Sequence, residues 1–462
     1  MLVGAWLLLT VNFGSFLGTP PQLEIFEEII CQKHRQSLGE GVFQNGTVFS
    51  DGDICKSEPV QSELAFVTGW KNTLDILPSV ALGLPFGVLA DKIGRRPITI
   101  VSLVATGLSE VWPRLVCWFG WPLRLVWLTG LFRAPGGGDL VATSMLLTVV
   151  ADVFDADERA TALFRLTSLS IIAEITATPI SASTMAVSPW IPYIAGSVIM
   201  LIGSLSSLFI PETLGVGTAR PIMEEADEQE IPESLQPSSQ KDTVFQIVVS
   251  QAQEFLNSSA FMWQKPSVLV SLLVVFAGSL DKSNLALLIQ YASAKFHWTI
   301  AQAAYLISLR GAVTLTLYLA IIPLISSLLI HKLRYTALQK DLFIARMAAM
   351  AGVIGYFLVF IAPHTAPLIV GIVFMSLSMP FVISVMSVAT SFVSAEHVAT
   401  LFSAMSVSQA LGNIVAGPTF AKFYVVGMQF GLRWSGLPFA FGSVLFLMSL
   451  IPVLIMRVHN RA

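Results

Sequence analysis

The chain has 462 residues, of which 54% are hydrophobic and only 12% are charged, with a formal net charge of −3. A soluble domain carries about 25% charged residues, and so few charges cannot cover the surface of a water-soluble protein. The composition therefore excludes a soluble enzyme, a nucleic-acid-binding protein and a disordered scaffold, and it places the chain in a lipid bilayer. Three cysteines are too few for a disulfide framework or a cysteine-based zinc site.

Twelve apolar stretches approach the length of about 20 residues that a helix needs to cross the hydrocarbon core of a membrane. None alternates as a membrane β-strand does, so all twelve are predicted to be transmembrane helices. Six precede a long polar segment and six follow it. They are residues 2–18, 67–90, 98–119, 123–150, 160–185 and 191–210, and then 268–291, 300–328, 342–362, 366–392, 399–426 and 437–456.

The first stretch lacks the basic flank and the small-residue cleavage site of a signal peptide, so we expect it to be a retained helix. Lysine and arginine are more frequent in the loops that lie inside when the N-terminus is inside. Both termini are therefore predicted to be cytoplasmic. On this topology, the sequon at Asn45 lies in the first outer loop and is a candidate glycosylation site. Cys31 and Cys55 flank it, either as a disulfide or as two unpaired thiols.

The polar segment 212–265 is rich in glutamate and is predicted to be a cytoplasmic linker, either a simple tether or a regulatory loop. It separates a first bundle of six helices, residues 1–211, from a second bundle, residues 266–462. A weak internal repeat supports two halves, since residues 155–169 align with residues 393–407. The predicted fold is an all-α membrane protein with twelve transmembrane helices in two six-helix bundles, a plan known among transporters.

The most specific motif lies between the second and third stretches, where residues 87–97 read GVLADKIGRRP. Gly87 allows close helix packing, and Gly94 permits a turn with a positive φ. Asp91 can accept hydrogen bonds from helix N-terminal amides or pair with an arginine. This pattern resembles the G-x-L-a-D-r-x-G-r-r loop of the major facilitator superfamily, which lies in the same place after the second of twelve helices.

The resemblance implies that this loop is a conformational latch that holds one state of a two-state transporter. Arg95 and Arg96 would pair with acids at the inner ends of neighbouring helices, and Asp152 is the candidate partner. Opening the latch would shift the equilibrium between states without any contact to substrate.

Two further segments resemble family signatures. Pro211-Glu212-Thr213 is similar to the P-E-S or P-E-T ending of the sixth helix. Residues 173–179 are similar in outline to the G-x-x-x-G-P signature of proton-driven exporters, but alanines replace both glycines and Glu174 lies within the segment. The overall pattern resembles fungal drug and solute carriers of the superfamily, and the replaced glycines keep an importer open as the alternative.

Charged residues inside the predicted helices are candidates for the transport site, because a charge at mid-bilayer costs about 2.5–3.5 kcal/mol even on lenient scales. Asp139 or Glu174 is the hypothetical proton-coupling residue, with Arg133 and Arg310 as counter-charges or anion anchors. The alternative is a buried structural ion pair, such as Glu174 with Arg133. Asp281 is a further candidate, or else faces the outer vestibule.

Two asparagines complete the set of candidate site residues, and an ion pair and a glycine run lie outside that set. Asn12 and Asn413 are predicted to line the cavity. Lys71 and Asp75 lie four residues apart near the outer end of the second stretch, where they would pair with each other or with an outer loop. The three glycines at 136–138 either unwind the fourth helix toward substrate or only kink it.

These features predict a secondary active transporter that moves a small organic molecule by alternating access. Proton-coupled efflux of a drug or secondary metabolite is the preferred interpretation, with a proton-coupled importer as the alternative and a non-transporting receptor as the third. The chain contains no nucleotide-binding loop, metal-ligand spacing or catalytic signature, so we expect no enzyme activity, metal or cofactor beyond the proton gradient. A monomer in the plasma membrane is the default expectation, with vacuolar or other internal membranes as alternatives.

Overall fold

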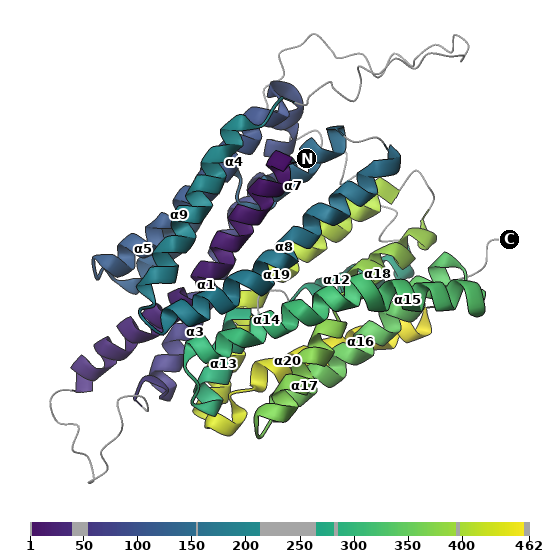
Figure 1. Ribbon diagram of the computed structural model, residues 1–462. Coiled ribbons are helices and arrows are strands. Elements are labelled where there is room, and N and C mark those ends of the chain that lie inside the picture. The colour runs from purple at the N-terminus through teal and green to yellow at the C-terminus, as the bar shows by residue number, and fades with distance from the viewer. Residues whose placement is uncertain are drawn as a thin grey trace.

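The computed structural model describes residues 2–38, 54–153, 156–212, 265–280, 285–393 and 398–456. Within these ranges the regular elements are all helices, and they form two bundles (Figure 1). The sequon at Asn45, most of the predicted linker, and Asp281 lie outside the described residues.

The first bundle is built from the elements before the linker. They are α1 (Leu2–Leu38), α3 (Glu58–Ile93), α4 (Arg95–Ser109), α5 (Val111–Trp118), η1 (Leu123–Leu128), α6 (Thr129–Arg133), η2 (Ala134–Gly136), α7 (Asp139–Val153), α8 (Ala156–Met185), α9 (Trp190–Ser206) and η3 (Ser207–Phe209).

The second bundle is built from the elements after the linker. They are α12 (Pro266–Ser279), α13 (Leu285–Phe296), α14 (Ile300–Thr316), η6 (Leu317–Ile321), α15 (Ile322–Ser327), η7 (Leu328–Lys332), α16 (Ala337–Ile361), α17 (Thr365–Leu377), α18 (Phe381–Ala389), η8 (Thr390–Phe392), α19 (Val398–Gln429), η10 (Leu432–Trp434) and α20 (Leu437–Ile455).

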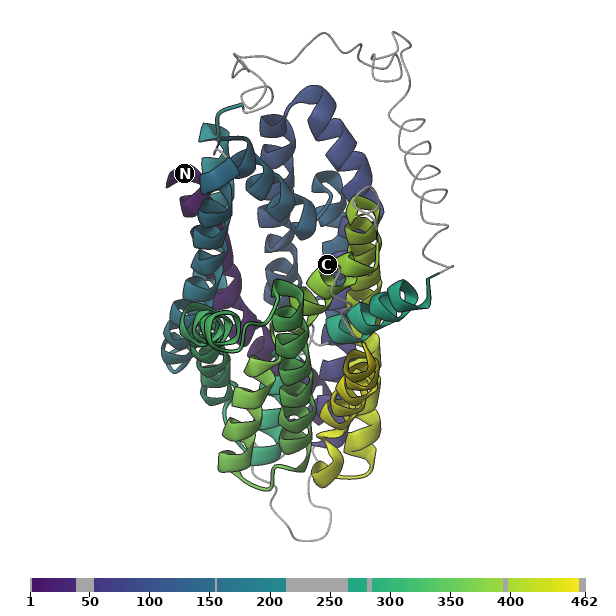
Figure 2. The ribbon, with the colours of Figure 1, turned by 90° about the vertical axis from the view of Figure 1, so that its right-hand side faces the viewer.

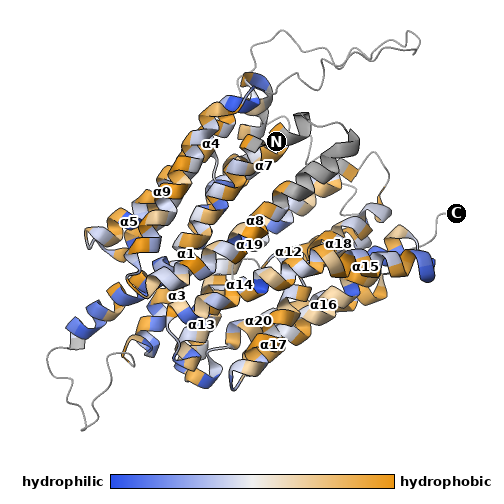
Figure 3. Ribbon diagram, in the orientation of Figure 1, coloured by the Kyte–Doolittle hydropathy of each residue, from blue (hydrophilic) through white to orange (hydrophobic). Residues whose placement is uncertain are grey.

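Each of the twelve predicted stretches coincides with one helix or with a run of shorter helices. Seven helices of the described part are long and apolar enough to cross a membrane by themselves. The described parts of the seventh stretch are α12 and α13. The eighth contains the π-helical segment η6, and a second one, η7, begins at its last residue. Hydrophobic residues cover most of the helix surfaces, and hydrophilic residues gather at helix ends (Figure 3).

The first helix is twice as long as its predicted stretch, which ended at Gly18. α1 continues through Pro20 and Pro21 to Leu38, although this part carries three glutamates. A tertiary contact compensates one of these charges. Glu27 is buried and accepts hydrogen bonds from Lys56 Nζ at 2.7 and 2.8 Å.

The fourth predicted helix is broken at its three glycines. Gly137 and Gly138 have φ values of +71° and +80°, a region that favours glycine. α7 then begins at Asp139. A Cβ atom at Gly138 would lie 2.2 Å from Ser79 Oγ, so the break is also a point of close packing against α3. The break places Arg133 and Asp139 on two short helices whose ends face each other.

The two bundles meet along two pairs of helices. α3 packs on α19, where a Cβ atom at Gly69 would lie 2.8 Å from the carbonyl oxygen of Gly417. α8 packs on α14, where a Cβ atom at Gly311 would lie 2.8 Å from Ile175 Cγ1. Glycine at these positions lets the helix backbones of opposite bundles approach closely.

Polar contacts join the bundles at the end opposite to the chain termini. Gln290 Nε2 on α13 donates hydrogen bonds to the backbone oxygen of Gln61 at 2.7 Å and to its Oε1 at 3.0 Å. Lys56 Nζ also donates to Ser293 Oγ at 2.7 Å. Toward the end that carries both termini, α4 and α9 diverge from α15 and α16 (Figures 1 and 2). On the predicted topology, the bundles are therefore closed outside and separated inside.

Candidate functional site: a charged cavity between the bundles

A cavity of about 350 Å³ lies between the bundles and is lined by polar side chains from both. α1, α3, α6, α7 and Glu110, which lies between α4 and α5, form most of its wall, and α13 and α19 close it from the second bundle. Its polar lining residues are Ser15, Thr19, Gln22, Thr68, Lys71, Asn72, Asp75, Glu110, Arg133, Asp139 and Asn413.

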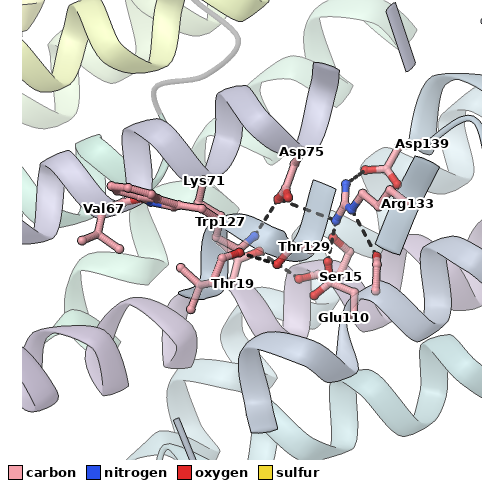
Figure 4. A network of polar contacts seen from close by, with 12 residues as sticks. Ser15, Thr19, Val67, Lys71, Asp75, Glu110, Trp127, Thr129, Arg133 and Asp139 are labelled. Atoms are coloured by element: carbon pink, nitrogen blue, oxygen red, sulfur yellow. Dashed lines mark hydrogen bonds and ion pairs between the residues drawn. The ribbon is translucent and has the colours of Figure 1, made fainter. Parts of the chain in front are cut away.

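Arg133 is the centre of a buried charge network in this wall (Figure 4). Its Nη2 lies 2.6 Å from Glu110 Oε1, and its Nη1 donates to Asp139 Oδ2. Its Nε donates to Ser109 Oγ at 3.1 Å, and Asp75 Oδ2 lies 3.9 Å from its Nη2. Charges this deep are tolerated only when several partners compensate their desolvation, and Arg133 has three carboxylates around it.

Two further cations extend the network at its flanks. Lys71 Nζ contacts Asp75 Oδ2 at 2.7 Å, one turn apart on α3. Arg114 Nη1 contacts Glu110 Oε2 at 2.9 Å, and its Nε donates to the backbone oxygen of Tyr193 at 3.0 Å. The six charged groups of the network are three cations and three carboxylates, so it is formally neutral. Protonation of any one carboxylate would leave a cation without a full countercharge.

Asp139 differs from the other acids because 52% of its side chain is exposed, within the cavity wall. It is the first residue of α7, where a carboxylate is stabilised by the positive end of the helix dipole. The left-handed turn at Gly137 and Gly138 directs this helix start toward Arg133. The sequence allows either a kink or unwinding at this point, and the helix is interrupted here between η2 and α7.

Glu174 pairs with Arg310 across the bundle interface. Its Oε1 lies 3.8 Å from Arg310 Nη1, and both side chains are largely buried. The alternative pairing of Glu174 with Arg133 is wrong, because α8 presents Glu174 to α14 and the network around Arg133 faces the cavity. Glu174 is not among the residues that line the main cavity.

The two candidate asparagines lie in different environments. Asn413, on α19, lines the main cavity from the second bundle. Asn12 lines a smaller cavity of about 130 Å³ inside the first bundle, which also borders Glu110, Arg133 and Asp139. Its Nδ2 donates to the backbone oxygen of Leu8 at 2.7 Å, within its own helix.

Sequence reasoning did not assign Lys71, Asp75, Glu110 or Arg114 to this site. Lys71 and Asp75 were expected near a helix end, but α3 begins at Glu58, so both lie well inside the helix. An opposite-charge pair at i and i+4 inside an apolar helix was the available signal. Arg114 follows Glu110 by the same spacing and pairs with it in the same way.

The loop predicted to be a latch contains a capped helix start. Gly94 has a φ of +111° and ends α3. The backbone amides of Arg95 and Arg96, which open α4, donate to the Glu212 carboxylate at 2.9 and 3.2 Å. Arg96 Nη2 also donates to the backbone oxygen of Leu208 at 3.0 Å. A carboxylate there satisfies amides that a helix start leaves free.

This contact is separate from the predicted pairing of the arginines with Asp152, which stays a prediction. Glu212 belongs to the Pro-Glu-Thr ending of the sixth predicted helix, and its carboxylate connects the end of that helix to the latch loop. The side chains of Asp91 and Asp152 lie outside the described part of the chain. Gly87, by contrast, has open space around the position of a Cβ atom, so close helix packing does not explain it in this state.

Comparison with known proteins gives the family. The sequence profile of the Major Facilitator Superfamily matches residues 59–417. The chain belongs to this superfamily. Superfamily members are not a class of enzymes, and the chain is an integral membrane protein of the transporter type.

Relatives and solved structures agree over nearly the whole chain. The chain is 31% identical to the MFS-type transporter avaK of Aspergillus versicolor, over 100% of this chain and 93% of that protein. It is 32% identical to the MFS efflux pump atnC of Emericella nidulans, over 96% and 85% of the two chains. It is 30% identical to the efflux pump ustT of Aspergillus flavus, over 97% and 86%.

The superfamily fold is shared with structures of low sequence identity. A D-xylose-proton symporter has a TM-score of 0.60 at 14% identity and covers 98% of this chain and 95% of its own. The human organic anion transporter MFSD10 has a TM-score of 0.56 at 15% identity, covering 98% of both chains. These likenesses concern the fold alone.

Cys31 and Cys55 form a disulfide in this superfamily member, with their Cα atoms 5.1 Å apart. Cys31 lies near the end of α1, and Cys55 precedes α3. The bond holds the neighbouring Lys56 beside Glu27, at the end where the bundles meet.

Proposed function

We propose that this protein is a proton-coupled exporter of a small organic molecule, such as a drug or secondary metabolite, that works by alternating access. The observation that carries the proposal is the charged cavity between two bundles that contact each other at one end and diverge at the other. Two relatives that cover most of this chain are named efflux pumps, which supports export over import.

Alternating access would proceed by rocking the bundles about the α3–α19 and α8–α14 contacts. In the state described here, the cavity would receive its substrate from the cytoplasm, given the predicted topology. Rocking would break the contacts of Gln290 and Lys56 at the outer end. It would bring the inner ends together, where the latch loop lies.

Asp139 is the proposed proton-coupling residue. It is the network acid most open to the cavity, and its contact with Arg133 is a salt bridge that protonation would weaken. A proton on Asp139 would therefore free Arg133 to shift toward Glu110 and Asp75, its other two acids. Proton binding and network rearrangement would then be linked, as coupling requires.

The ion pair of Glu174 is proposed to depend on the relative position of the two bundles. Its ion pair with Arg310 spans the α8–α14 interface, so a rocking motion changes its length. The pair would favour one state through an interaction absent in the other.

The test uses inverted plasma-membrane vesicles that contain the protein and are energised acid-inside. A panel of organic compounds is added, and proton efflux is recorded with a pH-sensitive dye. The expected result is compound-dependent efflux that Asp139→Asn abolishes and that the control Ser406→Ala retains. Ser406 is an exposed α19 residue that bonds only its own helix in the described contacts.

Absence of efflux for every compound contradicts the exporter. Uptake in right-side-out vesicles, driven by an inward proton gradient, would then establish the importer instead. Efflux that persists in Asp139→Asn removes the coupling role from Asp139, and the same assay on Glu174→Gln tests the second candidate.

A further inference from the structure

Two residues that line the cavity, one on each bundle, each have a buried acceptor atom that no described residue satisfies. Asp75 is 6% exposed and lines the cavity. Its Oδ2 contacts Lys71, but its Oδ1 accepts no hydrogen bond in the described part of the chain. Asn413 Oδ1, on the opposite wall, is also buried without a donor among the described residues. Each such acceptor costs about 1–3 kcal/mol when left unpaired, which a ligand with donor groups would recover.

The charged side chains that line the cavity have a net negative charge, which also favours a ligand with hydrogen-bond donors. Among the described lining residues, three are carboxylates, Asp75, Glu110 and Asp139, and two are cations, Lys71 and Arg133. Arg114 compensates Glu110 from behind the wall, because it is not among the lining residues. Both cations already contact carboxylates within the wall, so the free capacity of the cavity is for hydrogen-bond donors and positive charge.

The uncharged part of the lining favours a polar ligand. It is made of hydroxyl and amide side chains from α1 and α3, with a few aliphatic residues, and no aromatic residue is among those described in the wall. Many of the aromatic side chains instead face outward, as Trp6, Trp118 and Phe119 do at the bundle surface. Aromatic abundance in the sequence therefore does not describe the site. A volume of about 350 Å³ lies at the small end of ligand cavities.

We propose that the transported molecule carries a protonated amine, which binds between Asp75 and Asp139 of the first bundle and Asn413 of the second. An ammonium group has three donors and no acceptor, which matches a cavity whose unpaired atoms are acceptors. The inference rests on the proposed transport function and adds the substrate class to it.

Binding of this group would also draw the bundles together. Asp75 lies on α3 and Asn413 on α19, the helix pair along which the bundles pack. A ligand that donates to both residues interacts with the two bundles at once. It therefore stabilises states in which both residues contact the ligand, which is how substrate would change the equilibrium between states.

The experiment measures thermal stabilisation of the purified full-length protein in detergent at pH 7. The probes are matched sets of three small molecules that share a similar carbon framework and differ in charge. The first set is tyramine, which is a cation, its neutral amide N-acetyltyramine, and the anion 3-(4-hydroxyphenyl)propionate. Several further amines with matched amides and acids form the panel. We expect amines to raise the melting temperature in a saturable way, with at least tenfold tighter binding than their amides.

Variants at Asn413 keep the test independent of the network, whose disruption can unfold the protein. Asn413→Leu removes the acceptor and should weaken amine binding by about tenfold. Asn413→Asp replaces it with a carboxylate and should retain or strengthen the preference for amines. Ser406→Ala, on the same helix, should change neither affinity nor selectivity.

Two results would overturn the inference. The first is a rise in melting temperature with amides or carboxylates that equals the rise with amines across the panel. A panel in which no compound raises the melting temperature counts as the same result. The second is amine binding that Asn413→Leu leaves unchanged.

The two proposals fail in different assays. Proton efflux driven only by neutral or anionic compounds would support the exporter proposal and contradict the proposal that the substrate carries a protonated amine. Selective binding of amines without proton movement in vesicles would support the proposed amine site and contradict the proposal of proton-coupled export.

Discussion

Gln290 on α13 donates hydrogen bonds to both the backbone oxygen and the side-chain oxygen of Gln61 on α3, and both residues are almost fully buried. This contact joins the two bundles at the end opposite to the chain termini. Its atoms are shielded from water, so its loss is not replaced by solvent hydrogen bonds. We therefore expect it to favour the state that is closed at this end.

Replacing Gln290 with Leu should shift the protein toward the state that is open at this end. Loss of the contact removes about 1–2 kcal/mol from the closed state, which corresponds to a shift of roughly 5- to 30-fold. The measurement is the labelling rate of a cysteine introduced at Thr19, in a background with Cys117 replaced. Gln302→Leu, which removes an exposed capping residue of α14, is the control and should not alter the rate. An unchanged rate for Gln290→Leu contradicts a gating role.

Gly138 should be intolerant of any side chain. A Cβ atom there meets Ser79 Oγ at 2.2 Å, and the φ of +80° is unfavourable for alanine by about 1–2 kcal/mol. Gly138→Ala is therefore expected to lower the melting temperature and to displace Asp139. The matched control is Gly83→Ala on α3, where a Cβ atom has open space. Equal stability of the two variants would disprove the close packing at the helix break.

Exchanging the charges of Glu174 and Arg310 tests their pairing. Each single reversal, Glu174→Arg or Arg310→Glu, leaves like charges in the α8–α14 interface and should reduce transport at least tenfold. Breaking a buried pair costs about 3–5 kcal/mol. The double reversal restores opposite charges and should recover part of the activity. Transport by the double variant that is no better than by the singles would show that the two residues act separately.

Glu212 should support the latch loop through its carboxylate. Glu212→Ala leaves the amides of Arg95 and Arg96 without their described acceptor and should cost about 0.5–2 kcal/mol. We expect slower transport with normal membrane expression, because the loop acts on the equilibrium between states. Glu212→Asp keeps the charge on a shorter side chain and should be less impaired. If Glu212→Ala transports at the wild-type rate, Glu212 does not contribute to the function of the latch loop.

The disulfide between Cys31 and Cys55 should be found in the mature protein. Peptide mapping by mass spectrometry without reduction is expected to recover the two cysteines in one linked peptide pair. Cys117, buried in α5, serves as the internal control and should be recovered as a free thiol. Recovery of Cys31 and Cys55 as separate thiols would refute the bond. The position of Lys56 would then not be fixed by a disulfide.

The sequence by itself determined the membrane location and the helices. Helices are local structures with their backbone hydrogen bonds inside one segment, and a bilayer forces apolar composition on each of them. For that reason the twelve stretches coincide with the observed helices, and the GVLADKIGRRP loop identified the family. The break at 136–138 was also visible locally, because glycine is the residue that tolerates a positive φ.

The tertiary structure alone decided which charges share one site. Asp139 was recognised as an acid inside a predicted membrane helix, but its network includes Lys71, Asp75 and Glu110 from other parts of the bundle. Glu174, on a neighbouring helix, pairs with Arg310 of the other bundle instead. Ion pairs in a membrane depend on the rotation and depth of each helix, which packing between helices sets. Hydropathy along one chain contains no information on either, so the partners emerge only when the bundles assemble.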